Sequence, residues 1–547
     1  MVNFIIMFHS TRKPSMFDKI TAFFQQNKFV IQSALLTVIV LLSSVFFYKF
    51  NSIAVGYSSR MILFLGILSA VLLFLFCLLY KYFSKKESSK TLPRFYLIIL
   101  LLMGTMYSAV FLPGTAPDEP YHYESSFYYS NLITGHTNED SLLVMRETDI
   151  KFENDALTTV MDKKSYQSVR QALTDSSSND FETTSIDGQT KSLPQTRIFS
   201  AIGISLGQLF GLNGTLTFYL GRLFNFMCFA LLAFAAYKIT PVGKMLFAAI
   251  TLLPMTLHIT SSYSYDATII GLSLLLIALC LKGIYSEQKC SQKLLVAIPV
   301  VTFFLAPCKV LYALSALLVF LIPNANFSSK KFAYIYKFGL MGLALFAVCI
   351  FKLPDLLNMA GVSSASADPT SDGLAYRGEE SGHYHALSTL ISNPLSALFI
   401  FVNTINQKFD FYLNTFLGGF LGWFQPEIRT PWFFILLFLG ILFYTARKSD
   451  IDSIIPSKKT KTVFAILSFL MYTAVVMSML LGWTFDTELA AEGVQGRYFL
   501  PFAPLIFLLL RTKNTQRSED SSPIILLTLF ALNAMNLIYI WAAMARC

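Results

Sequence analysis

The sequence predicts an all-α polytopic membrane protein. Of its 547 residues, 54% are hydrophobic and only 14% are charged, whereas charged residues make up about a quarter of a typical soluble domain. Apolar runs of about 17 to 25 residues recur along the chain, and this is the length that crosses a hydrocarbon core about 30 Å thick. These observations exclude a soluble globule and predict a bundle of about 13 transmembrane helices with two long loops.

The predicted spans run along most of the chain, and several are short, so their ends are defined only to within a few residues. They are residues 29–48, 61–80, 95–112, 215–237, 245–262, 264–281, 294–307, 310–323, 338–353, 432–446, 463–482, 498–511 and 523–544.

The distribution of Lys and Arg predicts the orientation, because cytoplasmic loops carry an excess of these residues. With 13 spans, all the basic segments fall on one face: 12–28, 81–94, 238–244, 282–293, 330–337, 447–461 and 511–517. Residues 1–28 are then a cytoplasmic N-terminal segment of a plasma-membrane protein, while loops 113–197 and 354–431 and the C-terminus are extracytoplasmic. The net charge of +10 reflects this topology and an attraction to anionic lipid, and does not indicate nucleic-acid binding.

The composition of the two long loops predicts surface structure. Residues 139–192 are rich in Asp, Glu, Ser, Thr and Asn, which predicts a solvated segment that is mobile in part. Residues 198–211 are apolar but would break the charge alternation as a span, so we expect an interfacial or re-entrant helix there. In the second loop, residues 386–424 predict interfacial helices followed by a glycine-rich turn. The seven cysteines show no spacing typical of a disulfide framework or a zinc site.

Residues 113–123 form the most distinctive motif, with Asp118, Glu119 and His122 between prolines directly after an apolar run. Prolines fix their own φ and keep the preceding residue out of helical geometry, so a stiff turn is expected at the exit of the span. Such a turn can hold a carboxylate in a fixed position, as a catalytic acid or base requires. The alternative is a surface acidic turn without a catalytic role.

Four further charged residues are expected at the same depth on the outer face: Arg222, Asp266, Lys309 and Arg497. A charged side chain costs about 2.5 to 3.5 kcal/mol at the centre of a membrane helix, so charged residues next to predicted spans indicate a functional or structural role. One outward-facing polar cavity accounts for all four. The alternatives are snorkelling of Arg222 and Lys309 to headgroups, a helix cap at Asp266 and an interfacial anchor at Arg497.

These motifs together resemble a known family. Pro117-Asp-Glu-Pro-x-His122, Gly221-Arg-Leu-x-Asn225, Leu253-Pro-Met-Thr256 with Asp266-Ala267, Leu421-Gly-Trp423 and Gln495-Gly-Arg-Tyr-Phe-Leu-Pro501 occur in the order seen in a bacterial family of multi-pass predicted membrane proteins (domain of unknown function 2142 type). That family is grouped with the GT-C superfamily of membrane glycosyltransferases. The resemblance covers residues 95–547 as a GT-C-like membrane domain, and residues 29–94 are then two additional helices and a basic loop. One departure is Ala306-Pro-Cys-Lys309, where the family is expected to have lysine followed by proline.

The resemblance implies a glycosyltransferase that takes a sugar from a polyprenyl-phosphate donor on the extracytoplasmic face, usually with inversion. The acceptor would be a cell-surface polysaccharide, a teichoic acid or a related glycan or glycolipid. Such a transfer needs a carboxylate base for the acceptor hydroxyl, for which we choose Asp118, with Glu119 raising its pKa or orienting the acceptor; the two roles are interchangeable at this point. Arg497, Arg222 and Lys309 would stabilise the leaving phosphate. Further candidate binding residues are His122, Asp266, Tyr312, Trp423, Gln495 and Tyr498.

Other functions remain open at this point. No cofactor is predicted, since the first loop lacks an Asp-x-Asp motif, although the adjacent acids leave a divalent metal open. A flippase for lipid-linked oligosaccharides would use the same cations without a base, and a polysaccharide polymerase or ligase would transfer a whole chain in place of one sugar. The sugar, the acceptor and the oligomeric state cannot be read from the sequence.

Overall fold

The structure is a computed structural model, and it describes residues 24, 26–84, 88–136, 142–185, 193–359, 374–377, 380–449, 452–517 and 521–547. In this part of the chain the fold is mainly helical, with two short two-stranded sheets. The all-α class predicted from the sequence is therefore confirmed for the membrane bundle.

Eight helices in the described residues are long and apolar enough to cross a membrane. They correspond to eight of the predicted spans: α2 (Lys28–Val55), α3 (Arg60–Ser84), α4 (Ser88–Val110), α9 (Gly214–Ile239), α12 (Asp266–Ile284), α14 (Lys330–Met359), α18 (Lys458–Gly482) and α20 (Ser521–Met544). The windows of α12 and α20 are 83% buried, whereas that of α2 is 17% buried. Helices α12 and α20 are therefore central, and α2 lies at the edge of the bundle.

The other five predicted spans are not confirmed as full crossings. Residues 245–262 are split by Pro254 into α10 (Lys244–Thr251) and α11 (Pro254–Thr260), as expected where a proline removes a helical donor. Residues 310–323 form a 3₁₀ helix, η2 (Val310–Leu321). The remaining three are short apolar segments: α13 (Gln292–Leu305), α17 (Trp432–Thr445), and η5 (Gly496–Phe502) continuing into α19 (Ala503–Leu508).

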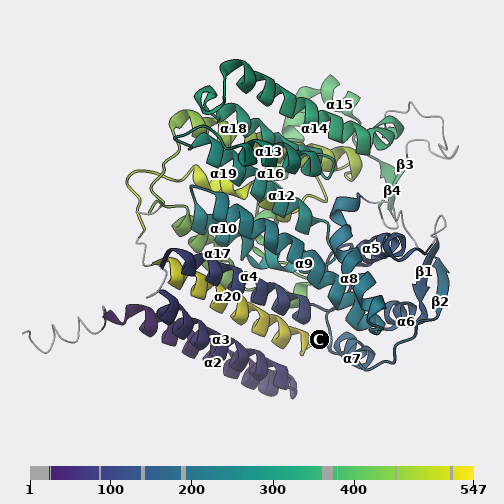
Figure 1. The fold of residues 1–547 in the computed structure, drawn as a ribbon. Helices are drawn as coiled ribbons and strands as arrows, with labels where there is room; N and C mark the ends of the chain where they lie inside the picture. Colours follow the sequence, from purple (N-terminus) through teal and green to yellow (C-terminus); the bar gives the residue numbers. More distant parts are fainter. Residues whose placement is uncertain are drawn as a thin grey trace, which may run out of the picture.

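The long helices lie side by side, with α2 and α3 along one edge next to α4 and α20 (Figure 1). The elements of the first loop gather at one end of the bundle, and the short strands of the second loop, β3 (Leu374–Arg377) and β4 (Glu380–His383), lie at the same end (Figure 1). This arrangement agrees with the prediction that both long loops share a face.

The first loop is more ordered than its composition suggested. Strands β1 (Leu142–Arg146) and β2 (Phe181–Ser185) pair antiparallel, and helices α6 (Glu147–Ala156) and α7 (Lys163–Ala172) lie between them in the chain. A few apolar side chains, including Phe152, Met161 and Val169, are buried. Helix α5 (Glu119–Thr134) precedes β1, while η1 (Pro194–Thr196) and α8 (Ile198–Leu209) follow β2. The remaining residues of the predicted mobile segment, 139–141 and 186–192, lie outside the described residues.

A partly buried carboxyl in this unit gives the loop a pH-dependent stability. Burial, with Glu124 and Asp149 nearby, raises the pKa of Glu153 to about 7. Between its ordinary pKa and 7 the folded protein then binds more protons than the unfolded chain, so stability falls as pH rises through this window. In Glu153→Gln the free energy of unfolding should fall by about 1 to 3 kcal/mol less than in wild type over this pH window, because one pKa unit corresponds to about 1.4 kcal/mol. Thermal unfolding in detergent from pH 4.5 to 8 tests this, and parallel wild-type and variant curves would contradict it.

The second loop leads into the helices that close the site. After α15 (Leu387–Ser392) come α16 (Pro394–Leu417), a glycine-rich turn and η4 (Pro426–Ile428). Gly496 in η5 packs directly on the backbone of α16, where an added Cβ would collide with the Tyr412 carbonyl and the Phe416 amide. The Gly496 N–H also donates to Thr415 Oγ1 at 2.7 Å. This close approach fixes η5, which carries Arg497, against α16.

Candidate functional site

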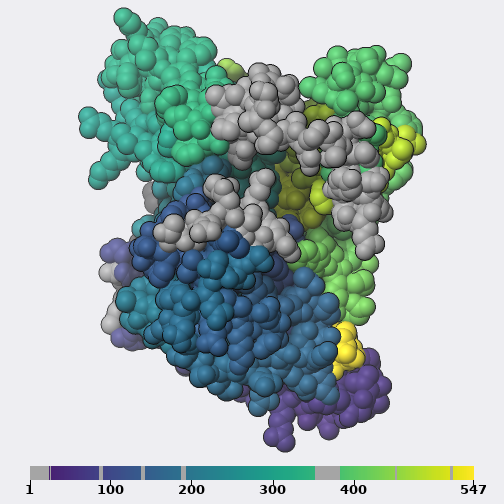
Figure 2. All heavy atoms as spheres, turned by 90° about the vertical axis from the view of Figure 1, so that its right-hand side faces the viewer, coloured from purple at the N-terminus to yellow at the C-terminus, as the bar shows by residue number. Residues whose placement is uncertain are grey.

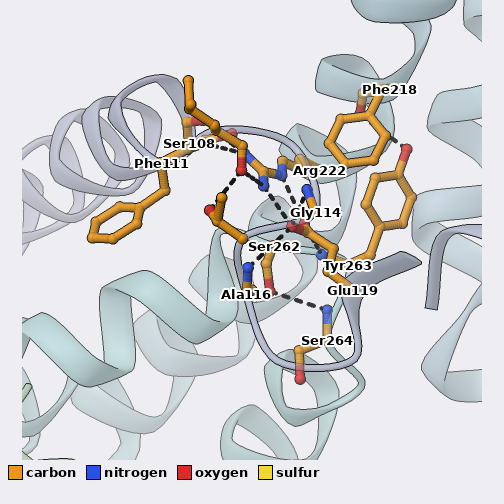
Figure 3. A network of polar contacts seen from close by, with 12 residues as sticks. Ser108, Phe111, Gly114, Ala116, Glu119, Phe218, Arg222, Ser262, Tyr263 and Ser264 are labelled. Atoms are coloured by element: carbon orange, nitrogen blue, oxygen red, sulfur yellow. Dashed lines mark hydrogen bonds and ion pairs between the residues drawn. The ribbon is translucent and has the colours of Figure 1, made fainter. Parts of the chain in front are cut away.

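Glu119 is the centre of a buried polar network that ties four segments together (Figure 3). Its carboxylate accepts hydrogen bonds from Arg222 Nε at 2.8 Å and Arg222 Nη2 at 2.6 Å. It also accepts from the backbone N–H groups of Gly114 and Tyr263, both at 3.0 Å. The side chain is fully buried. The network joins the turn after α4, the start of α5, the middle of α9 and the segment before α12.

Arg222 has no donor left for a ligand. Its Nη1 donates to the carbonyls of Ser108 and Phe111, and its Nη2 donates to Leu112 and to Glu119. Together with Nε on Glu119, these bonds use all five N–H groups of the guanidinium. Arg222 therefore neither snorkels to headgroups nor faces a cavity. Glu119 was expected as a base or acceptor contact and Arg222 as a phosphate contact, and we instead assign both residues to positioning the turn that carries Asp118.

Asp118, the other acid of the motif, is exposed. It caps α5 with a φ of 59° and a ψ of 17°, in the left-handed region. Non-glycine residues occupy this region rarely, although Asp and Asn tolerate it best, and such conformations cluster at functional sites. Only Phe424 shares a positive φ among the described non-glycine residues. The neighbouring Glu119 network holds Asp118 in this conformation.

A second group of charges lies around Tyr265, at the start of α12. Asp266 Oδ2 is 3.8 Å from Arg497 Nε, and both side chains are buried. Lys309 Nζ lies 5.1 Å from the centre of the Tyr265 ring and 4.2 Å from that of Tyr498. No described carboxylate lies within ion-pair distance of Lys309 Nζ. The structure therefore brings together Asp266, Lys309 and Arg497, three of the four charges that the sequence placed at one depth, and adds Tyr498, whereas Arg222 lies in the Glu119 network.

Arg497 also has an unused donor. Its Nε is buried and makes no hydrogen bond with the described residues, and the Oε1 atom of Gln495 is in the same state. An unsatisfied buried polar group costs free energy, so such atoms commonly mark a place where a ligand or water binds. Tyr312 supports this region from η2, since its hydroxyl donates to the Tyr498 carbonyl at 2.8 Å.

An apolar cavity of about 530 Å³ opens beside Lys309. It lies between η2 and α18, with Lys309 and Tyr498 at its polar end and apolar residues such as Leu311, Leu314 and Val475 along its walls. Its volume falls in the range of about 300 to 1,000 Å³ that is typical of ligand pockets. In Figure 2 the blue first-loop unit forms the lower part of the face, and teal and green segments lie at the upper left and upper right. An apolar wall that ends at a cation suits a lipid with an anionic head.

His122 lies between the two groups, with a partner that the sequence analysis missed. Arg197 Nη2 is 2.6 Å from His122 Nδ1, and Arg197 Nη1 donates to the Tyr263 carbonyl at 2.8 Å. Arg197 is almost completely buried. Burial lowers the pKa of Arg197 to about 10. The only sequence signal was a single Arg directly before the apolar segment 198–211.

Trp423 is not drawn into this cluster. It lies in the turn after α16, next to Gly422, and its ring is 38% exposed. The turn itself is anchored, because the Gly422 N–H donates to His258 Nε2 at 3.2 Å and Gln425 Oε1 accepts from the Met161 N–H at 2.8 Å. Trp423 therefore presents its ring from a fixed turn that joins the two long loops.

Comparison with known families identifies the chain, because one family model matches residues 100–506. The chain belongs to the predicted membrane protein family DUF2142. It is a multi-pass membrane protein, and the family predicted from its motifs is confirmed. No curated protein and no solved structure matches it significantly.

The DUF2142 match contains every candidate site residue from Asp118 to Tyr498 and excludes α2, α3 and α20. The Glu119–Arg222 network and the Tyr265 cluster therefore belong to the family region. In the described residues no group of three or more His, Cys, Asp or Glu side chains could hold a metal ion.

Proposed function

We propose that this DUF2142 protein is a membrane glycosyltransferase of the GT-C type that transfers a sugar from a polyprenyl-phosphate donor to a glycan or glycolipid on the extracytoplasmic face. The observation that carries the proposal is the position of Lys309 at the polar end of an apolar cavity, with Arg497 5.3 Å from the ring of Tyr498, which also lines that cavity. A polyprenyl chain matches the apolar wall, and a phosphate matches the two cations.

The transfer step assigns a role to each group. Asp118 removes the proton from the acceptor hydroxyl as its oxygen attacks the anomeric carbon. The bond between that carbon and the phosphate oxygen breaks with its electron pair, so the lipid phosphate gains one negative charge. Lys309 and Arg497 stabilise this charge. Asp266 orients Arg497, and its distance of 3.8 Å leaves the guanidinium free to form hydrogen bonds with phosphate.

A transfer assay with reconstituted protein tests the proposal. We expect wild type to move radiolabelled sugar from at least one polyprenyl-phosphate sugar to polymer or glycolipid. Lys309→Met should lower the rate about 10- to 100-fold, in keeping with the loss of one charged contact to the transition state. Lys151→Met, which changes an exposed lysine of the first loop, should leave the rate unchanged.

Two other outcomes would contradict the proposal. Labelled lipid that crosses the bilayer without transfer would favour a flippase, and transfer of preformed chains in place of single sugars would favour a polymerase or ligase. Equal rates for wild type and Lys309→Met would remove Lys309 from the site.

A further inference from the structure

The contact between Arg197 and His122 determines where the histidine proton lies. A guanidinium has only donors, so the Arg197 nitrogen at 2.6 Å must donate to His122 Nδ1. An imidazolium would carry a proton on Nδ1 as well and would place two N–H groups against each other. The ring must therefore be neutral, with its proton on Nε2.

The surroundings of the ring favour the same state. Burial lowers the pKa of His122 well below its ordinary value, and Arg197, Arg497 and Lys309 lower it further. These cations come from three different segments, and the phenol ring of Tyr265 packs against the histidine with ring centres 4.9 Å apart. His122 therefore stays uncharged beside a site rich in cations.

The position of His122 indicates what its remaining N–H can reach. His122 follows Asp118 by one helical turn, since the backbone N–H of His122 donates to the Asp118 carbonyl at 3.0 Å. On its other side lies Tyr265, whose ring centre is 5.1 Å from Lys309 Nζ. Among the described residues, the side-chain hydrogen bond recorded for the His122 ring is the one at Nδ1. The His122 ring thus lies one turn after the proposed base and against Tyr265, which is itself in contact with Lys309 of the proposed phosphate site.

We propose that Arg197 holds His122 as the neutral Nε2–H tautomer, and that this N–H donates a hydrogen bond to a hydroxyl oxygen of the donor sugar. The second half of this inference rests on the proposed function. Arg197 is a positioning residue, and His122 determines how the sugar is held. A neutral donor suits this position, because a charged imidazolium would compete with Lys309 and Arg497 for the phosphate.

The first half can be tested without any activity measurement. Full-length protein with ¹⁵N-labelled histidine contains six histidines, and the His122 signals are those lost in His122→Gln. We expect a protonated Nε2 and an unprotonated Nδ1 that do not change from pH 8 to pH 5. Arg197→Met should make the ring titrate, whereas Arg197→Lys, which keeps a donor, should preserve the tautomer. A wild-type His122 that titrates near pH 6.5, or that carries its proton on Nδ1, would overturn the inference.

Arg146→Met is the matched control for loss of a buried arginine. Arg146 is as buried as Arg197 and lies in the same loop unit, but it pairs with Asp149. Its replacement should lower the melting temperature without altering the His122 signals. If Arg197→Met does not fold, Arg197→Lys still decides the question, because a change to the Nδ1–H tautomer in a folded Lys variant would contradict the inference.

The sugar contact is tested with the polyprenyl-phosphate sugar that wild type accepts in the transfer assay. His122→Leu should raise the donor KM about 10-fold, the value of one neutral hydrogen bond, whereas His122→Gln should recover most of this loss. An unchanged KM in His122→Leu would overturn the contact while leaving the tautomer result intact. Absence of transfer by wild type would count against the proposed function alone.

Discussion

Asp118→Asn is expected to lower the rate of sugar transfer by about 10²- to 10⁴-fold, the range that a positioned general base contributes. The change removes the only atom in the proposed mechanism that accepts the acceptor's proton. It should leave donor binding nearly unchanged, because the proposed mechanism assigns the phosphate to Lys309 and Arg497. The measurement is kcat and the donor KM in the transfer assay.

Asparagine is the right replacement because of the backbone at Asp118. The φ of 59° is tolerated by Asp and Asn but strains most other residues, so Asp118→Ala would mix a chemical effect with a conformational one. Asp155→Asn changes an exposed acid of the same loop unit and should retain full activity. If Asp118→Asn also retains full activity, Asp118 is not the base.

Glu119→Gln is expected to lower the free energy of unfolding by about 3 to 5 kcal/mol, because it leaves Arg222 as a buried charge without its counter-ion. The amide is nearly isosteric, so the loss reports on charge and not on volume. The turn that carries Asp118 should loosen as well, and transfer activity should fall together with stability. Unfolding in mixed detergent micelles measures the first effect.

The ion pair Lys151–Asp175 in the first loop supplies the control. Its N–O distance is 3.0 Å, similar to that of the Glu119 pair, but its side chains are 54% and 25% exposed. Lys151→Met should have little effect on the free energy of unfolding, because exposed ion pairs contribute little to stability. A double variant, Glu119→Gln with Arg222→Met, should cost less than the sum of the two single changes, since it removes both charges. Additive losses would contradict a coupled pair.

The sequence predicted the parts of the site that depend on local chemistry. The prolines around Asp118 indicated a stiff turn, and charges next to apolar runs indicated Asp266, Lys309 and Arg497. It could not predict which of two adjacent acids faces inward, because this depends on Arg222, 103 residues further along the chain. From the sequence, Asp118 and Glu119 were equally good candidates for the base, because the pairing of Glu119 with Arg222 was not evident.

The errors in the fold have a similar origin. Hydropathy identifies an apolar segment but not its path, so residues 310–323 could not be distinguished from a transmembrane helix. The polar composition of residues 139–192 concealed a small core, because a few residues such as Phe152 and Met161 are enough to order it. Arg197 was overlooked since a single charge before an apolar run is common in sequences.

Helices α2 and α20 contact each other although they are far apart in the sequence. Asn51 Nδ2 donates to the Ala542 carbonyl at 2.7 Å across 491 residues, and Arg546 donates to Asn51 Oδ1. During synthesis the α2–α3 hairpin enters the membrane long before α20 is made. The Asn51 side chain therefore forms these hydrogen bonds only after α20 has been made, and this edge of the bundle closes only then. Ribosome stalling before residue 521 should trap an intermediate in which this edge is still open.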